Sequence, residues 1–414
     1  DIAQCLVGSE MCIRDSYKDK SKCCGCGGCS FVCPKNAIVM RFDDCGVIYP
    51  HIDLEKCVGC NICVAFCSFG KNKNDTALVS YAASNVDGKQ KFKSSSAGIF
   101  PALATYFLRN GGAVVGVSLK MVNGKADVRH VMVTNENKLP ALQGSKYVQS
   151  AGLDNYREVL EFLKTGKKIL FSGTPCQISC FKSLFKKYSD QIYTVDIICH
   201  GVPGLEFFND YLSYLSKRYD VIVNNISFRD KSKGWGKDGI VECDGKTSHK
   251  SLSFSPYVSS YYRFFDNAEI FRDSCYSCPY TCLQRSGDLT IGDYWGAQKF
   301  SPELMVENGG MFNNREGVSC ILCNSQKGKM MLDCVKDSLI SAEVDVEKIL
   351  IINKQLREPA THTGLRDKIF KEYKSNGYKG VERIYLKIRR KEKAKKFIKS
   401  LIPEPMLKRL KKKL

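Results

Sequence analysis

Two runs of closely spaced cysteines carry the clearest chemistry in this sequence. Each run has the spacing Cys-x2-Cys-x2-Cys-x3-Cys, and the second run begins 34 residues after the first. Thiolate sulfur is a ligand that zinc and iron–sulfur clusters both prefer. A zinc ion usually needs only four ligands, often from two Cys-x2-Cys pairs, whereas each run offers three close cysteines and a fourth further on. We therefore expect iron–sulfur clusters, with structural zinc as the alternative.

The spacing resembles that of bacterial ferredoxins that hold two 4Fe–4S clusters. In these ferredoxins the fourth cysteine of each run binds the cluster of the other run. The expected ligands of the first cluster are Cys23, Cys26, Cys29 and Cys67. The expected ligands of the second cluster are Cys57, Cys60, Cys63 and Cys33. Cys24 lies off this spacing and receives no assignment.

The cysteine runs define a ferredoxin domain of mixed α and β structure over residues 17–75. Short strands are predicted over 37–42 and 46–50, between the two cysteine loops, from their alternating apolar residues. The segment 1–16 resembles a peptide translated from a sequencing adapter. We expect it to be non-native, and we derive no structure from it.

Residues 76–365 have the pattern of an α/β domain. Helices are predicted over 99–109, 154–163 and 177–188, and strands over 113–119, 168–172 and 192–198. A strand, a helix and a strand within about 30 residues form a βαβ unit, whose two strands pair in parallel. The fold class is therefore α/β, with a partly parallel sheet behind the ferredoxin domain.

Two further cysteines follow neighbouring strands of this predicted sheet. Cys176 comes after the first strand of the βαβ unit and Cys199 after the second. The carboxyl ends of parallel strands meet at one edge of a sheet, where ligands bind in open α/β folds. Together with Cys275 and Cys278, these thiols would bind a third 4Fe–4S cluster. Scattered buried cysteines are the alternative, and Cys282 competes with Cys278 for the fourth place.

Other cysteines favour ordinary packing. Cys320 and Cys323 lie in a segment that reads as a strand, where residues three apart point to opposite faces. We expect both in the core. The same expectation holds for Cys180, Cys243 and Cys334.

Composition narrows the class of protein. The 414 residues include 22 cysteines, which in a long chain with clustered Cys-x2-Cys pairs indicates metal binding in a reducing compartment. No apolar segment reaches the length of about 20 residues that a membrane-spanning helix needs, and no signal peptide is evident. We expect a cytoplasmic protein.

The region from residue 94 to 328 resembles the beta subunit of coenzyme F-420 hydrogenase/dehydrogenase. The segments that carry the resemblance are Ser94–Phe100, Gly144–Gln149, Phe171–Gln177, Ile198–Pro203, Ser227–Trp235, Cys275-x2-Cys278 and Ser286–Trp295. The resemblance implies FAD in the α/β domain and an iron–sulfur cluster near it. The implied cofactor-binding residues are Ser95, Ser96, Gly98, Ser145, Lys146, Tyr147, Thr174 and Gln177, with Arg285 and Asp288 as weaker matches. Ala97 departs from the family pattern, which usually has glycine there.

These features predict an iron–sulfur flavoprotein oxidoreductase. A hydride donor such as coenzyme F-420 gives two electrons at once and a cluster takes one, so a flavin between them can serve both. The expected partners are this redox cofactor and an electron-transfer protein, and no nucleic acid. The sequence does not identify the donor. The alternative is a non-catalytic ferredoxin-type carrier whose second domain has no flavin.

The C-terminal segment 366–414 is strongly basic. It holds 19 lysine and arginine residues and 5 aspartate and glutamate residues, which is a net charge of +14 within the chain's total of +20. Its apolar residues recur near helical spacing, which predicts a basic amphipathic helix. Such a helix can lie on an anionic membrane surface, and a solvated helix or tail is the alternative.

Overall fold

The fold is described from a computed structural model, which covers residues 19–74, 77–150, 155–245 and 248–400. The adapter-like segment 1–16 and the end of the basic tail lie outside these residues. By compactness the chain divides into two units, one reaching His362 and the other starting at Thr363. The predicted ferredoxin and α/β regions both lie in the first unit.

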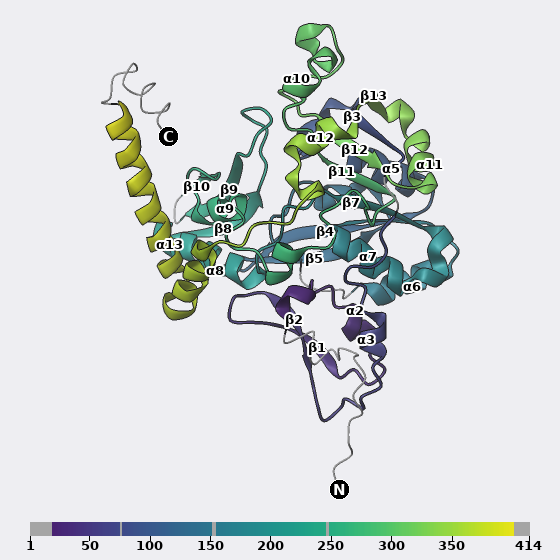
Figure 1. The fold of residues 1–414 in the computed structure, drawn as a ribbon, viewed down its shortest axis with the longest axis horizontal. Coiled ribbons are helices and arrows are strands. Elements are labelled where there is room, and N and C mark those ends of the chain that lie inside the picture. Colours follow the sequence, from purple (N-terminus) through teal and green to yellow (C-terminus); the bar gives the residue numbers. More distant parts are fainter. Residues whose placement is uncertain (1–18, 75–76, 151–154, 246–247, 401–414) are drawn as a thin grey trace. The chain divides into compact units, whose positions relative to one another are not determined.

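The ferredoxin region is built from short elements around its cysteine loops (Figure 1). These elements are η1 (Lys20–Lys22), α2 (Gly28–Phe31), β1 (Ile38–Phe42), β2 (Ile48–Ile52) and α3 (Ile62–Phe66). Strands β1 and β2 pair antiparallel, with Ile38 opposite Ile52. The two predicted strands are therefore confirmed, each within two residues at its ends.

An eight-stranded mixed sheet forms the centre of the first unit (Figure 1), in the order β13-β3-β12-β11-β7-β6-β4-β5. Its strands are β3 (Val79–Asn85), β4 (Ala113–Val122), β5 (Lys125–Val133), β6 (Ile169–Gly173), β7 (Ile192–Ile197), β11 (Leu289–Asp293), β12 (Ser319–Cys323) and β13 (Leu339–Glu343). Strands β4, β6, β7 and β11 run parallel to their neighbours in this group. The predicted parallel βαβ unit is confirmed.

Helices cover both faces of this sheet. Their bounds are α4 (Gly88–Lys93), α5 (Ile99–Arg109), α6 (Tyr156–Lys164), α7 (Pro175–Leu184), α10 (Ala297–Phe300), α11 (Gln326–Cys334) and α12 (Val346–Ile352). Because side chains alternate along a strand, Val114 packs with α5 and α11 on one face, while Val115 packs with α6 and α7 on the other. The result is the three-layer arrangement expected of an α/β domain.

The helix predicted over 177–188 differs from the structure. Helix α7 ends at Leu184, and the 3₁₀ helix η3 (Lys186–Gln191) continues to the next strand. The backbone at Phe185, which caps α7, departs from helical geometry. Helix α5, by contrast, has the predicted bounds, because Gly98 at its start and Asn110-Gly111-Gly112 at its end stop it on both sides.

A three-stranded sheet adjoins the central sheet within the first unit, in the order β10-β9-β8. It contains β8 (Val221–Ser227), β9 (Gly239–Gly245) and β10 (His249–Phe254), with α8 (Leu205–Tyr219) and α9 (Ser260–Asp266) beside it. The other 3₁₀ helices are η2 (Glu136–Leu142), η4 (Asp273–Ser277), η5 (Pro302–Leu304), η6 (Val306–Asn308), η7 (Lys336–Ser338) and η8 (Lys354–Leu356).

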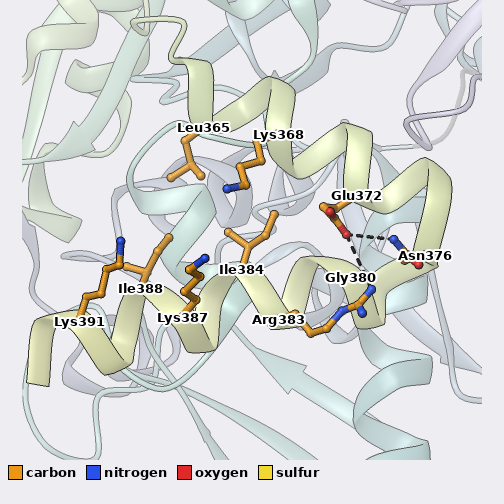
Figure 2. Close-up of a pocket in the computed structure, with 10 residues that line it drawn as sticks. All are labelled: Leu365, Lys368, Glu372, Asn376, Gly380, Arg383, Ile384, Lys387, Ile388 and Lys391. Carbon is orange, nitrogen blue, oxygen red and sulfur yellow. Dashed lines mark hydrogen bonds and ion pairs between the residues drawn. The ribbon is translucent and has the colours of Figure 1, made fainter.

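The second unit contains α13 (Gly364–Ser400), which is broken at Gly377. There the backbone takes φ 59° and ψ −162°, which suits glycine and turns the chain back on itself. Figure 2 shows the two helical arms facing each other across a groove with a volume of about 520 Å³. Glu372 of the first arm accepts from Asn376 at 3.0 Å and lies 3.8 Å from Arg383 of the second. No helix among the described residues is long and apolar enough to cross a membrane.

Candidate functional site

The first group of predicted ligands lines a single pocket in the ferredoxin region. Cys23, Cys26, Cys29 and Cys67 all border it. Gly25 and Gly27 have φ of 64° and 73°, which lets the loop curl around the pocket. Nowhere in the described chain do three potential ligands converge closely enough to hold one metal ion.

The second group forms on the other side of the same domain. Burial raises the pKa of Cys63, and the neighbouring thiols of Cys33 and Cys57 add to the rise. Cys60 is exposed to solvent. In both groups the fourth cysteine thus lies with the other run, as a crossed ligand set requires.

The third group gathers at the carboxyl edge of the central sheet. Cys176 lies in the first turn of α7, just after β6, and Cys199 follows β7. Burial raises the pKa of Cys199 well above its ordinary value, with Cys275, Cys176 and Cys278 as further causes. The four predicted thiols are therefore near enough to influence one another.

The competing cysteine points elsewhere. The Cys282 thiol donates to the carbonyls of Pro279 and Gln284, at 3.6 and 3.3 Å. Burial also raises the pKa of Cys275 to about 12 and that of Cys278 to about 11. Without a metal these buried thiols stay protonated at neutral pH, and they would lose their protons on binding one.

The predicted flavin residues from the chain segments 95–98 and 145–147 lie side by side. The Ser95 hydroxyl accepts from the Ser145 backbone N–H at 2.7 Å and bonds its hydroxyl at 2.8 Å. The Ser96 hydroxyl accepts from Ser319 at 2.9 Å. Gly98 precedes α5 with φ 81°, and no side chain caps this buried helix start. Uncapped N–H groups at a helix start attract phosphate.

Lys146 does not point outward from this group. Its ammonium donates to the carbonyls of Leu142 and Gln143 at 3.0 and 2.7 Å. Burial lowers its pKa to about 7. Tyr147 stacks on Phe265, with ring centroids 4.4 Å apart. Lys146 thus secures its own loop, while Tyr147 packs in an aromatic layer.

Thr174 and Gln177 lie apart from that group, at the start of α7. The Gln177 carbonyl oxygen accepts from the Thr174 N–H at 2.9 Å, which is half of a capping box. The Gln177 amide donates to Ser150 at 2.8 Å, and the Thr174 hydroxyl lies 3.2 Å from the Cys176 sulfur. Both residues therefore border the third cysteine group and the end of the 145–150 loop.

A buried polar cluster that the sequence did not reveal joins these pieces. Arg229 donates to Asp293 at 2.9 Å, to the Ser95 carbonyl at 3.1 Å and to the Tyr147 hydroxyl at 3.3 Å. Its guanidinium also lies 5.0 Å from the Trp295 ring, which stacks on Trp235. Both tryptophans and Arg229 fall within the family-like segments, but no local spacing links them.

Three buried polar atoms of this cluster have no hydrogen-bond partner. They are Nε of Arg229, Oδ1 of Asp293 and Nε1 of Trp235. Unsatisfied buried groups are rare because each costs about 1–3 kcal/mol. Their concentration beside an uncapped helix start fits a site for a polar cofactor such as FAD.

The weaker family matches have structural contacts. Arg285 forms a buried ion pair with Asp196 at 3.0 Å. Asp288 accepts from the backbone N–H and the hydroxyl of Thr194 at 2.9 and 2.6 Å. These bonds link the segment before β11 to β7. Both residues therefore stabilise the packing of these two neighbouring strands.

The predictions of core positions for the remaining cysteines are confirmed in four cases and wrong in one. Cys320 and Cys323 lie in β12 and are fully buried, as are Cys180 and Cys243. For these four the expected core position is confirmed. The expectation for Cys334 is wrong, because this last residue of α11 is exposed.

Comparison with known proteins agrees with this architecture. Residues 166–348 match the family described as the C terminus of the beta subunit of coenzyme F420 hydrogenase/dehydrogenase. Residues 16–39 match the 4Fe–4S binding domain. A stretch of 49 residues, 12% of the chain, is 41% identical to an uncharacterized ferredoxin of Methanocaldococcus jannaschii and covers 62% of it.

One solved structure is similar over part of the chain. A chain of the F420-reducing nickel–iron hydrogenase complex from Methanosarcina barkeri has a TM-score of 0.44 and 12% identity, over 68% of this chain and 89% of its own. The 4Fe–4S match covers the first cysteine run, and the beta subunit match covers the segments that bear the third cysteine group. Residues 166–348 are thus similar to the C-terminal part of the beta subunit of coenzyme F420 hydrogenase/dehydrogenase, and a match to a 4Fe–4S binding domain precedes them.

Proposed function

We propose that this protein is an iron–sulfur flavoprotein oxidoreductase with three 4Fe–4S clusters and FAD. The observation that supports the proposal is the closeness of the first and third cysteine groups. The pKa of the Cys24 thiol is raised well above its usual range, with the neighbouring thiols of Cys176 and Cys26 as its largest causes. Thr174 then links Cys176 to the residues proposed for flavin binding.

The chain's own residues would hold and orient these groups. When bound, FAD exchanges a hydride with a soluble cofactor and the clusters exchange single electrons. The start of α5 would receive the FAD pyrophosphate. The unsatisfied atoms of Arg229, Asp293 and Trp235 would bond polar parts of the cofactor. The apolar residues around Cys176 would exclude water.

The exposed second cysteine group is the proposed contact for a protein partner. Around the exposed Cys60, the apolar side chains of Leu54, Val58 and Ile62 are 65%, 63% and 44% accessible. Exposed apolar surface beside a redox site fits transient docking of an electron-transfer protein. The proposed compartment is the cytoplasm, because free thiols persist under reducing conditions.

The experiment is anaerobic purification followed by iron counting and absorption spectroscopy. We expect about 12 irons per chain, four for each cluster, and a flavin band that a reduced deazaflavin or nicotinamide bleaches. A protein with about eight irons and no flavin after reconstitution with FAD would instead be the non-catalytic carrier. A colourless zinc protein would contradict both.

Membrane contact through α13 is a second, separate proposal. Exposed lysines line the second arm, including Lys387 and Lys391. Val381, Ile384 and Tyr385 are buried, whereas Phe397 nearer the end of the arm is 66% exposed, so only part of the apolar stripe expected to enter a membrane is covered. The attraction that remains is electrostatic, toward anionic headgroups.

A further inference from the structure

The two nearest cysteine groups share one contact region. Arg272 bonds both: its Nη2 donates to the Cys23 carbonyl in the first group, and its own carbonyl accepts from the Cys275 N–H in the third at 3.1 Å. Segments far apart in sequence therefore meet here. Any charge placed at this junction acts on both groups, since Coulomb interactions are strong in a buried, weakly polar surrounding.

Arg272 places such a charge at the junction. Its side chain is 1% exposed, and its Nη2 donates to the Cys23 carbonyl at 2.6 Å. Its Nε donates to the Ser274 hydroxyl at 3.1 Å, and the guanidinium lies 4.8 Å from the Tyr49 ring. Among the residues that the structure describes, Arg272 forms no ion pair with a carboxylate.

Backbone contacts place Arg272 beside both cysteine groups. Its guanidinium reaches the loop of the first group, where it bonds the Cys23 carbonyl. Its backbone carbonyl accepts from the N–H of Cys275 in the third group at 3.1 Å. The positive charge therefore lies close to ligands of both groups.

One guanidinium nitrogen is left without a partner. Nη1 of Arg272 is buried and has no hydrogen-bond partner in the described chain. Gly25 makes room for it, because a Cβ at that position would collide with Nη1. A buried, unpaired positive charge is strongly unfavourable unless an anion compensates it. Cysteine-ligated clusters, whose thiolates are anionic, would supply that compensation.

We infer that Arg272 is a positioning residue shared by the first and third clusters, whose charge raises the reduction potentials of both. The inference rests on the proposed function, since it requires the third cluster. Reduction adds an electron to each cluster, and a fixed positive charge nearby favours the more negative state. The second cluster, whose ligands show no such contact with Arg272, keeps its potential.

The test uses the full-length protein, purified anaerobically, with Arg272→Gln and Arg272→Lys. Iron content is counted, and the clusters are titrated by redox potentiometry followed by electron paramagnetic resonance. In R272Q we expect the reduced-to-oxidised ratio of the first and third clusters to fall about tenfold at a fixed potential, which is 59 mV for one electron. R272K keeps the charge, so its potentials stay near those of the wild type. Arg109→Gln, at the exposed end of α5, serves as the control.

The outcomes separate the inference from the proposed function. About 12 irons with unchanged potentials in R272Q overturns the inference alone, as does an equal shift of all three clusters. About eight irons in the wild type removes the third cluster, and with it both proposals. If R272Q loses its iron, the potentials are measured in R272K instead. Wild-type potentials in R272K support the role of the charge, and a tenfold fall in its reduced-to-oxidised ratio overturns that role.

Discussion

At the scale of single residues, the proposed cluster ligands differ from the residues that surround them in how they are specified. The eight ferredoxin cysteines follow a local rule, so their grouping could be predicted from 45 contiguous residues. Cys24 and Arg272 could not, because their partners are set by the docking of distant segments. Cys334 was misjudged since a helix end can face solvent even when its neighbours pack inward.

The crossed ligand sets lead to a residue-level prediction. Cys33 belongs to the first run in sequence, yet its thiol lies beside Cys63 and Cys57. Cys33→Ser should therefore remove the second cluster, about four irons, and leave the first intact. Iron counting and electron paramagnetic resonance would show this. Cys45→Ser, in the same domain, is the control; loss of the cluster at Cys23 with the second retained would contradict the assignment.

His130 gives a prediction about pH. It lies in β5, its ring stacks on Phe171, and neither ring nitrogen has a hydrogen-bond partner. Burial lowers its pKa to about 4, whereas an unfolded histidine has a pKa of about 6.5. Since the unfolded chain binds the proton first, stability falls as pH drops from about 6.5 to 4.

His130→Phe should remove this part of the acid sensitivity. Between pH 7.5 and pH 5 we expect the wild type to lose about 2 kcal/mol more unfolding free energy than the variant. Denaturant titrations at the two pH values measure the difference, in which other acid effects cancel. His249→Gln, an exposed histidine in β10, should keep the wild-type slope. Equal pH slopes in the wild type and H130F would rule out the role assigned to His130.

At the scale of elements, patterns bounded by strong stop signals were predicted best. Helix α5 and strand β7 match their expected ranges closely, because glycines or abrupt polarity changes delimit them. The sequence did not predict the positions of β3, β11, β12 and β13 in the sheet, although the segment of β12 was predicted to be a strand. The pairing of β3 with β12 and β13 joins residues more than 200 positions apart, and no local signal encodes such neighbours. The same holds for the buried cluster around Arg229.

The second arm of α13 gives a prediction at this scale. Because several of its apolar residues are buried, binding to anionic vesicles should depend chiefly on exposed lysines, each contributing about 1 kcal/mol. The triple variant K387Q/K391Q/K395Q should bind about a hundredfold more weakly, and added salt should weaken the wild type steeply. Vesicle sedimentation measures both effects.

A matched control removes the same number of charges elsewhere. Lys125, Lys217 and Lys336 are exposed in the first unit, and K125Q/K217Q/K336Q should bind vesicles like the wild type. If both triple variants bind equally well, the arm is only a solubilising segment. An acidic protein partner would then be the better expectation for it.

At the scale of the whole molecule, the ferredoxin region is an integral part of the first unit. Cys26, Phe31 and Phe66 pack against the same core as α6 and α7, and Phe31 meets Tyr156 edge to face at 5.5 Å. The sequence indicated both regions but not this contact, which depends on shape matching across the fold. The packing keeps the first and third cysteine groups at a fixed separation, as transfer between them requires.

The exposure of Cys60 has a consequence for survival in air. Of the twelve predicted ligands it is the one that is exposed, so dioxygen reaches the second cluster before the others. Aerated protein should lose iron in stages, about four irons first and the remainder more slowly. Absorbance decay followed against iron release would reveal a single phase if all clusters were equally accessible. If iron is lost in stages, the second cluster reacts with dioxygen first, and the two other proposed clusters survive a brief exposure to air.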